Sequence, residues 1–456
     1  MLDIKFIREN SELIKEGCQK KQVKVDIDRL LEVDEKRRET LRALEDIRAQ
    51  KNKASKEISQ TKNEKEKRKI ILEMKELDKN NDRLDKNLKE LEKRFNNLMI
   101  QIPNLPFDDV PIGKDERDNV VLKKVGEKIK FGFKPKDYLA LSENLDLIDI
   151  KRAAKISGTR FGFIKREAVL LEFALINFAF DTLTKDYNPP TASEGPKRKF
   201  GREEGGSESR SPYDERAPGF IPIIPPVMIK PEMALGMGYL EQTGDDEAYY
   251  LKKDNLYLIG TSEQSMGTMH AGEIFDEKDL PKRYLGFSTC FRREAGAYGR
   301  DTRGIFRVHQ FDKVEMFSFC KTEKSQREHQ FLLEMEENLM KTLKIPYQVV
   351  KICTGDLGRP ASAKYDIEAW IPSENRYRET HSTSNCTDFQ ARRLNIRYRS
   401  KSGKLNFVHT LNGTAFAIGR TLIAIIENFQ QKDGSIRVPE ILQKYLNFNV
   451  INRAHK

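Results

Sequence analysis

The chain has 456 residues, of which 34% are charged, and its formal net charge at pH 7 is +11. This length exceeds what one compact core usually holds, so we expect two folded parts. The positive excess favours a polyanionic partner, and a basic soluble protein without such a partner is the alternative. Because no apolar run is long enough to span a bilayer and the N-terminus lacks a signal-peptide core, we expect neither a membrane protein nor a secreted one.

The cysteines are scattered, with no CxxC pair or other close ligand spacing. This pattern predicts neither a disulfide framework nor a zinc cluster, and we expect no zinc. Reduced thiols in a cytoplasmic protein are the simplest interpretation. The five cysteines are Cys18, Cys290, Cys320, Cys353 and Cys386.

Residues 30–98 contain no glycine or proline and are dominated by Lys, Glu, Arg, Asp and Leu. In the second half of this segment apolar residues recur at alternating steps of four and three, with Asn81 at the one polar seam position. That is a heptad repeat, which is typical of a coiled coil. The seam consists of Ile70, Met74, Leu77, Leu84, Leu88, Leu91, Phe95 and Leu98.

The first half has a looser seam, and the polar stretch Ser59–Lys67 separates the two halves. We therefore predict an antiparallel helical hairpin, with a coiled coil between two chains as the alternative. At roughly 30 residues per helix and about 1.5 Å per residue, the arm would reach about 45 Å. Its lysines and arginines form either an ordinary solvated face or a grip for a phosphate backbone.

We place an N-terminal domain at residues 1–110, a linker at 111–136 and a mixed α/β domain at 137–456. Leu170–Leu183 is an apolar helix, and Gly219–Met228 reads as a strand that runs into Pro225 and Pro226. Residues 187–217 are rich in Pro, Gly, Ser and charge, a composition typical of a flexible insertion.

The segment Phe291–Phe317 predicts a strand, a Gly-rich loop with arginines, and a second strand. Arginine forks suit phosphate oxygens, an aromatic residue such as Phe311 can stack on a base, and Glu294 can accept from an exocyclic amine. An exposed basic hairpin with ordinary ion pairs is the alternative.

Three further sequence segments flank this predicted hairpin along the chain. Thr261-Ser262-Glu263 precedes it, Asp366–Arg393 follows it, and Leu411–Phe429 runs from a small-residue strand into an apolar helix. Together these segments resemble the motifs of the class II aminoacyl-tRNA synthetases, most closely those of the seryl-tRNA synthetases with a coiled-coil arm. The resemblance implies an α+β fold, an antiparallel sheet flanked by helices, joined to the N-terminal antiparallel coiled-coil hairpin.

The resemblance also implies roles at the nucleotide. Arg292 would contact the α-phosphate and Arg420 the γ-phosphate, and these two are the expected catalytic residues. Glu294 would accept from the adenine amine, and Phe311 would stack on the ring. The full set that the resemblance implies for ATP is Arg292, Arg293, Glu294, Arg307, Val308, Phe311, Glu379, Thr380, His381, Ser382 and Arg420.

For the amino acid, the resemblance implies a second set, in which Thr261 and Glu263 would share one face of an extended segment. That set is Thr261, Ser262, Glu263, Arg292, Glu315, Asn412 and Thr414. Glu379 and Ser382 would hold Mg²⁺, which prefers oxygen ligands. Seryl enzymes usually carry an aliphatic residue and a serine where this chain has Thr380 and His381, and His381 fits a packed histidine better than a new base.

The implied activity is ATP-dependent formation of seryl-adenylate, followed by transfer of the seryl group to tRNA(Ser), which a homodimer would bind across its two subunits in the cytoplasm. Use of tRNA(Sec) stays open. The rival interpretations are a threonyl enzyme, a relative that aminoacylates a carrier protein, and a non-catalytic RNA-binding protein. A zinc site would favour the first, a missing arm the second, and loss of the ATP-binding arginines the third.

Overall fold

The computed structural model describes residues 1–186, 218–240, 248–295 and 303–453. The chain divides into two units, Met1–Leu105 and Pro106–Lys456. The predicted insertion at 187–217 lies outside the described residues.

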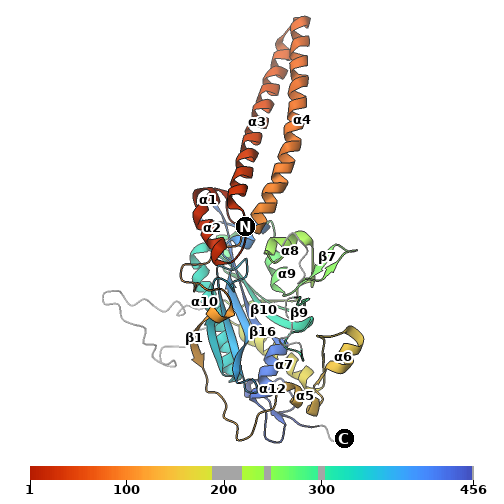
Figure 1. The fold of residues 1–456 in the computed structure, drawn as a ribbon, viewed down its shortest axis with the longest axis vertical. Coiled ribbons are helices and arrows are strands. Elements are labelled where there is room, and N and C mark those ends of the chain that lie inside the picture. Colours follow the sequence, from red (N-terminus) through yellow and green to blue (C-terminus); the bar gives the residue numbers. More distant parts are fainter. Residues whose placement is uncertain (187–217, 241–247, 296–302, 454–456) are drawn as a thin grey trace, which may run out of the picture. The chain divides into compact units, whose positions relative to one another are not determined.

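The N-terminal unit is helical (Figure 1). Two short helices, α1 (Ile4–Glu9) and α2 (Ser11–Lys20), precede two long ones, α3 (Ile27–Gln60) and α4 (Glu64–Gln101), which lie side by side and antiparallel. The break between the long helices falls within the predicted polar turn. Asn63 caps α4 by accepting from the Lys65 amide at 3.0 Å, so the turn residues end one helix and start the next. The predicted hairpin is confirmed.

The base of the hairpin belongs to the core of this unit. Leu30 and Val33 of α3 are buried with Leu91 and Phe95 of α4 against the short helices. Farther out, the seam residues of α4 are only half-buried, and Lys51 faces Asp78 across the two helices in an ion pair. The distal part of the arm therefore depends on its own two-helix seam.

The C-terminal unit is built on an eight-stranded sheet among the described residues, in the order β1-β11-β12-β13-β16-β10-β9-β4. All neighbouring strands are antiparallel except β4 and β9. The strands are β1 (Val120–Val125), β4 (Ile221–Ile223), β9 (Lys282–Phe291), β10 (Gln310–Cys320), β11 (Tyr347–Lys351), β12 (Ala363–Ile371), β13 (Arg376–Asn385) and β16 (His409–Ala417).

Residues 111–136 differ from the linker that the sequence suggests, because β1 lies within them and pairs with β11 at the edge of the sheet. Five of the six side chains of β1 are exposed, so the strand lacks the apolar alternation that would have revealed it. Residues 120–125 are thus an edge strand of the sheet and not part of a linker.

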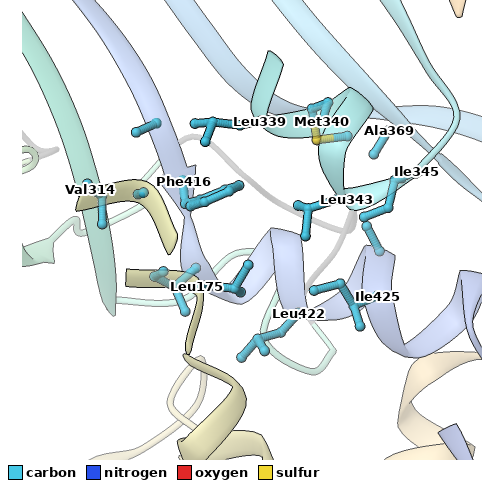
Figure 2. Packing of buried hydrophobic residues seen from close by; sticks show 14 of the residues in the cluster. Leu175, Val314, Leu339, Met340, Leu343, Ile345, Ala369, Phe416, Leu422 and Ile425 are labelled. Carbon is cyan, nitrogen blue, oxygen red and sulfur yellow. The ribbon is translucent and has the colours of Figure 1, made fainter. Parts of the chain in front are cut away.

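Three helices cover one face of the sheet and form the main core with it (Figure 2). They are α7 (Glu167–Leu183), α10 (Ser325–Leu343) and α12 (Ile418–Asn428). Leu175, Leu343 and Leu422, one from each helix, are buried together with Val314 and Phe416 of the sheet. The helix expected at Leu170–Leu183 is present and starts three residues earlier.

Smaller elements surround this framework. The predicted strand at Gly219–Met228 is interrupted at Pro225 and Pro226, with β4 before them and β5 after them. No helix among the described residues is both long and apolar enough to cross a membrane. The remaining elements are α5 (Tyr138–Leu145), β2 (Ile148–Asp149), α6 (Ile150–Ser157), β3 (Phe163–Ile164), β5 (Met228–Ile229), α8 (Pro231–Met237), β6 (Tyr250–Leu251), β7 (Leu256–Leu258), α9 (Glu263–Thr268), β8 (Ile274–Asp276), α11 (Phe389–Leu394), β14 (Arg397–Arg399), β15 (Leu405–Phe407), β17 (Ile436–Arg437), α13 (Glu440–Gln443) and β18 (Val450–Ile451), with short 3-10 turns at Glu116–Asp118, Glu277–Asp279 and Thr322–Lys324.

Candidate active site

A cavity of about 540 Å³ lies in the C-terminal unit, lined by side chains of β10, β13 and β16, the start of α12 and the segment before α9. Most of the residues predicted from the motifs line this one cavity: Thr261, Glu263, Arg292, Glu294, Arg307, Val308, Phe311, Glu315, Glu379, Thr380, Ser382, Asn412, Thr414 and Arg420. Arg293, Ser262 and His381 do not line it.

The strand–loop–strand prediction holds for the described part of the hairpin, since β9 and β10 pair from Phe291 opposite Gln310 onward. Arg292 leaves the strand, and its Nε donates to the Gly260 carbonyl at 3.0 Å. Its guanidinium carbon lies 5.3 Å from the centroid of the Phe311 ring. The cation and the flat aromatic face are therefore held together at one end of the cavity.

The far end of the hairpin carries a second pair, in which Arg307 Nη1 lies 3.3 Å from Glu294 Oε2. Arg293 and Arg303 are exposed and do not line the cavity, so the expected ATP contact of Arg293 stays a prediction. The loop residues Gly296, Gly299 and Arg300 lie outside the described residues.

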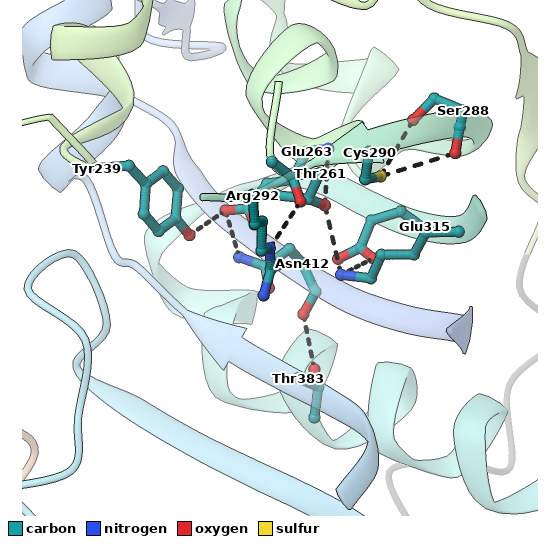
Figure 3. Close-up of polar contacts among 11 residues, drawn as sticks. Tyr239, Thr261, Glu263, Ser288, Cys290, Arg292, Glu315, Thr383 and Asn412 are labelled. Carbon is teal, nitrogen blue, oxygen red and sulfur yellow. Dashed lines mark hydrogen bonds and ion pairs between the residues drawn. The ribbon is translucent and has the colours of Figure 1, made fainter. Parts of the chain in front are cut away.

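A second part of the cavity wall is built around the carboxylate of Glu263 (Figure 3). The Tyr239 hydroxyl donates to Glu263 Oε1 at 2.6 Å, and the Asn412 amide donates to the same oxygen at 2.8 Å. Burial, together with the nearby Glu315, raises the pKa of Glu263 to about 7. A cationic group that binds beside Glu263 would therefore stabilise the ionised form of this carboxylate.

The Thr261–Glu263 segment is not extended as the sequence suggested. Ser262 has helical backbone angles and Glu263 begins α9. The Ser262 hydroxyl is buried without a hydrogen-bond partner among the described residues and lies close to Gly286 of β9. The turn from β7 into α9 thus places Ser262 outside the cavity lining, and its expected contact with serine stays a prediction.

Lys313 is a cavity residue that the motif analysis missed. Its ammonium forms an ion pair with Glu315 and lies 3.4 Å from the Thr261 hydroxyl. Burial raises the pKa of Glu315, with Lys313 acting in the opposite direction. The alternation of Phe311, Lys313 and Glu315 along β10 places them on one face, and this signal was available in the sequence.

Strand β13 forms the third wall. Ile367 pairs with His381 while the next residue, Glu368, pairs with Glu379, so a bulge at Thr380 interrupts the alternation. Glu379, Thr380 and Ser382 consequently face the cavity.

His381 lies behind the sheet, with its ring 5.7 Å from that of Phe416. Burial lowers its pKa to about 3. This placement agrees with the packed histidine that the sequence favoured, and the expected ATP contact of His381 stays a prediction.

Glu379 is held by Arg420, whose Nη1 lies 3.0 Å from Glu379 Oε2 and donates to the Glu379 carbonyl at 3.1 Å. Desolvation favours protonation of Glu379, but Arg420 and Lys364 outweigh it and lower its pKa to about 2. This carboxylate stays ionised near neutral pH and is available to a cation.

Two further cavity residues lay outside the predicted set. Lys364 lines the wall beside Glu379 and pairs with Asp366 at 3.0 Å. Phe306 packs under Arg420, 4.8 Å from the guanidinium carbon to the ring centroid. No cluster of three or more His, Cys, Asp or Glu side chains suited to a metal occurs in the described part of the chain.

Comparison with known proteins places these features in context. Residues 249–429 match the family model of the tRNA synthetase class II core domain (G, H, P, S and T), and residues 1–106 match the Seryl-tRNA synthetase N-terminal domain. The serine–tRNA ligase of Dictyoglomus turgidum is 44% identical over 454 residues, 99% of each chain. That of Rubrobacter xylanophilus is 40% identical over the full length of both.

Two solved structures resemble the whole chain. The seryl-tRNA synthetase of Pyrococcus horikoshii complexed with ATP has a TM-score of 0.84 and 38% identity, and covers 100% of both chains. The cytoplasmic serine–tRNA ligase of Naegleria fowleri in complex with AMP has a TM-score of 0.81 and 31% identity, and covers 100% of this chain and 99% of the other.

Proposed function

The chain belongs to the seryl-tRNA synthetase family of class II ligases, and from this premise we propose how its cavity joins serine to tRNA. The serine carboxylate attacks the α-phosphate of ATP, which gives seryl-adenylate and releases pyrophosphate. A hydroxyl of the terminal adenosine of tRNA then attacks the seryl carbonyl and releases AMP. One observation carries the proposal. A single cavity is lined both by an arginine–aromatic pair, Arg292 and Phe311, and by the buried carboxylate of Glu263.

The nucleotide fits the arginine end. We assign the adenine to the face of Phe311, the adenine amine to Glu294 and the α-phosphate to Arg292. Arg307 and Arg420 serve the terminal phosphates, each of them now paired with a carboxylate at the cavity wall. Carboxylate partners hold guanidinium groups in place before the triphosphate arrives, so less side-chain entropy is lost on binding.

Serine fits the carboxylate end. Glu263 accepts from the serine ammonium, with Tyr239 and Asn412 keeping the acceptor oxygen in place. Glu315 and Thr414, which both line this part of the cavity, meet the serine hydroxyl. A site built to hydrogen-bond a hydroxyl discriminates strongly against amino acids that lack one, because its own polar groups would stay unpaired.

Glu379 and Ser382 are the residues that would hold Mg²⁺. Both line the cavity beside Arg420, and the lowered pKa of Glu379 provides a hard anionic oxygen. Two protein oxygens suit Mg²⁺, which takes its other ligands from phosphates and water. When bound, the ion would neutralise charge on the phosphates.

The reaction needs no protein nucleophile, because the serine carboxylate already carries its charge. Positioning and charge neutralisation lower the barrier. Arg292 neutralises the charge that develops on the phosphate oxygens when the serine carboxylate attacks the α-phosphate. Arg420 stabilises the pyrophosphate that leaves.

We further propose a homodimer. Large apolar side chains stay exposed on α7 and around β4: Leu170 (46%), Phe173 (56%), Ile221 (48%) and Ile224 (82%). Exposed apolar patches of this kind mark protein–protein interfaces, and the helix and strand correspond to the first class II motif, which forms the dimer interface in that family.

The arm of α3 and α4 completes the proposal. We assign it to tRNA(Ser), bound across the two subunits through phosphates and sugars, where sequence matters less than shape. The same surface would suit tRNA(Sec). All five cysteines are buried thiols outside disulfides, which agrees with a reducing compartment, and we place the enzyme in the cytoplasm.

Pyrophosphate exchange into ATP, measured with each amino acid in turn, tests the proposal. Exchange with serine alone is expected. Exchange with threonine in place of serine would overturn the specificity, and no exchange with any amino acid would overturn the catalytic assignment.

A further inference from the structure

We propose that Arg160, which lies outside every motif assigned above, is a positioning residue for adenine recognition and acts through Glu294. It lies between α6 and β3, far from the hairpin in sequence. Its Nη1 donates to the backbone carbonyl of Glu294 at 2.7 Å. The inference rests on the proposed role of Glu294 at the adenine amine.

The backbone of Arg160 contacts the other side of the same hairpin. Its carbonyl accepts from the His309 amide at 2.9 Å, and the His309 carbonyl accepts from the Arg292 amide at 3.0 Å. The ring of His309 reaches back as well, with Nδ1 2.9 Å from the Arg292 carbonyl. Arg160 therefore connects the chain segment that follows β9 with the one that precedes β10, where the hairpin extends beyond the sheet.

Glu294 needs such a restraint because of its backbone. Its φ is +51°, in the left-handed region, which is unfavourable for a residue with a Cβ. A hydrogen bond from a charged donor to its carbonyl offsets that cost. Arg160 thus stabilises the one backbone conformation that directs the Glu294 side chain to the cavity.

The side chain of Glu294 has Arg307 on its other side, at 3.3 Å. Without Arg160 the backbone at Glu294 can relax to an ordinary conformation, and the carboxylate would lose its aim at the adenine amine. Phe311 stacking and the proposed phosphate contacts of Arg292 and Arg420 do not depend on this carbonyl. A change at Arg307, the partner of Glu294, would affect all nucleotides alike, so the additional loss should fall on nucleotides that carry the amine.

The test compares ATP with purine riboside triphosphate, which lacks the exocyclic amine, in serine-dependent pyrophosphate exchange. Arg160→Met should lower kcat/KM for ATP about tenfold, the loss expected when a charged hydrogen bond is removed. The kcat/KM for the purine analogue and the KM for serine should stay within about twofold of those of the unaltered protein. Equal losses with both nucleotides, or no loss with either, would overturn the proposal.

Two variants sharpen the result. Arg160→Lys keeps the charge and one donor, should partly restore the preference for ATP, and serves if the methionine variant folds poorly. Glu294→Leu, which removes the acceptor, should abolish the preference by itself. If Glu294→Leu retains the preference, the proposed role of Glu294 is wrong. If Glu294→Leu loses it and folded Arg160→Met does not, only the role of Arg160 is wrong.

Discussion

Arg420 and Glu379 form an ion pair of 3.0 Å that joins the first turn of α12 to β13 across the proposed phosphate end of the cavity. Each residue constrains the other, since Arg420 keeps Glu379 ionised and Glu379 holds the guanidinium at the cavity wall. A triphosphate with its Mg²⁺ offers both groups new partners of opposite charge. Without ligand, Arg420 and Glu379 therefore neutralise each other, and the proposed role of each residue can be measured separately.

Glu379→Gln should raise the Mg²⁺ concentration needed for half-maximal pyrophosphate exchange at least about tenfold, since metal-site changes typically cost 10–100-fold in affinity. The amide keeps the size of the side chain but removes its charge. Glu368→Gln is the matched control, because Glu368 lies on the neighbouring strand, bonded to Gln348 and outside the cavity. An unchanged Mg²⁺ requirement in the Glu379 variant would remove this residue from the metal site.

The raised pKa of Glu263 predicts a pH dependence of serine use. The carboxylate form binds the serine ammonium, and its pKa of about 7 means that the free enzyme loses this form as pH falls. Thus kcat/KM for serine should decline below pH 7 by up to about tenfold per unit, since this ratio reports the free enzyme. Glu263→Gln should be much less active and pH-independent in this range.

Tyr239→Phe provides a matched comparison for this titration. The Tyr239 hydroxyl stabilises the charged carboxylate and lowers its pKa, so its removal should shift the midpoint to higher pH without abolishing exchange. A midpoint that stays in place, or moves down, would show that another group controls the profile.

Sequence patterns predicted the placement of side chains where strands alternate regularly and where the helix keeps its heptad repeat. Alternation along β10 places Phe311 and Glu315 in the cavity, as their motif suggested, and the heptads of α4 predicted the hairpin. The same patterns do not predict side-chain placement where a bulge interrupts the alternation of a strand. Counting by twos from Glu379 puts His381 in the cavity, but the bulge at Thr380 moves it behind the sheet.

Two other placements could not be read from the sequence. Ser262 lies in a turn whose direction no alternation rule gives. Arg160 belongs to no motif and reaches the hairpin only through the tertiary fold.

Shortening the arm should separate the two reaction steps. We propose to replace residues 52–77 with a short Gly-Ser turn, which leaves the Lys51–Asp78 pair and the buried base of the hairpin intact. Pyrophosphate exchange should stay within about twofold, and kcat/KM for tRNA(Ser) should fall on the order of a hundredfold, a loss of about 3 kcal/mol. Charging at the full rate by the shortened protein would exclude the arm from tRNA binding.

A charge on α7 should split the proposed dimer. Phe173→Glu places a carboxylate in the apolar surface, and an unpaired charge buried at an interface costs about 3–5 kcal/mol. Sedimentation should show a monomer where the unaltered protein is a dimer. Ile71→Glu is the control, because Ile71 is an exposed apolar residue of the arm. The same mass for the unaltered protein and both variants would contradict an interface at α7.

His381 offers a prediction about stability rather than activity. The folded state depresses its pKa to about 3, below the ordinary value of about 6.5. Its neutral form therefore contributes full stability above pH 6.5, and this contribution is lost as pH falls toward the folded pKa. By linkage, protonation of the unfolded chain should cost about 2 kcal/mol of unfolding free energy between pH 7.5 and pH 5.

His381→Val should remove that loss, so the difference in unfolding free energy between the two pH values should shrink by about 2 kcal/mol. Its Nε2 is buried without a partner among the described residues, so the valine variant also avoids an unsatisfied polar group. Denaturant titrations at pH 7.5 and pH 5 measure this, and pyrophosphate exchange serves as the activity control. An undiminished pH dependence, or an ATP KM raised about tenfold or more, would show that His381 has a role at the cavity after all.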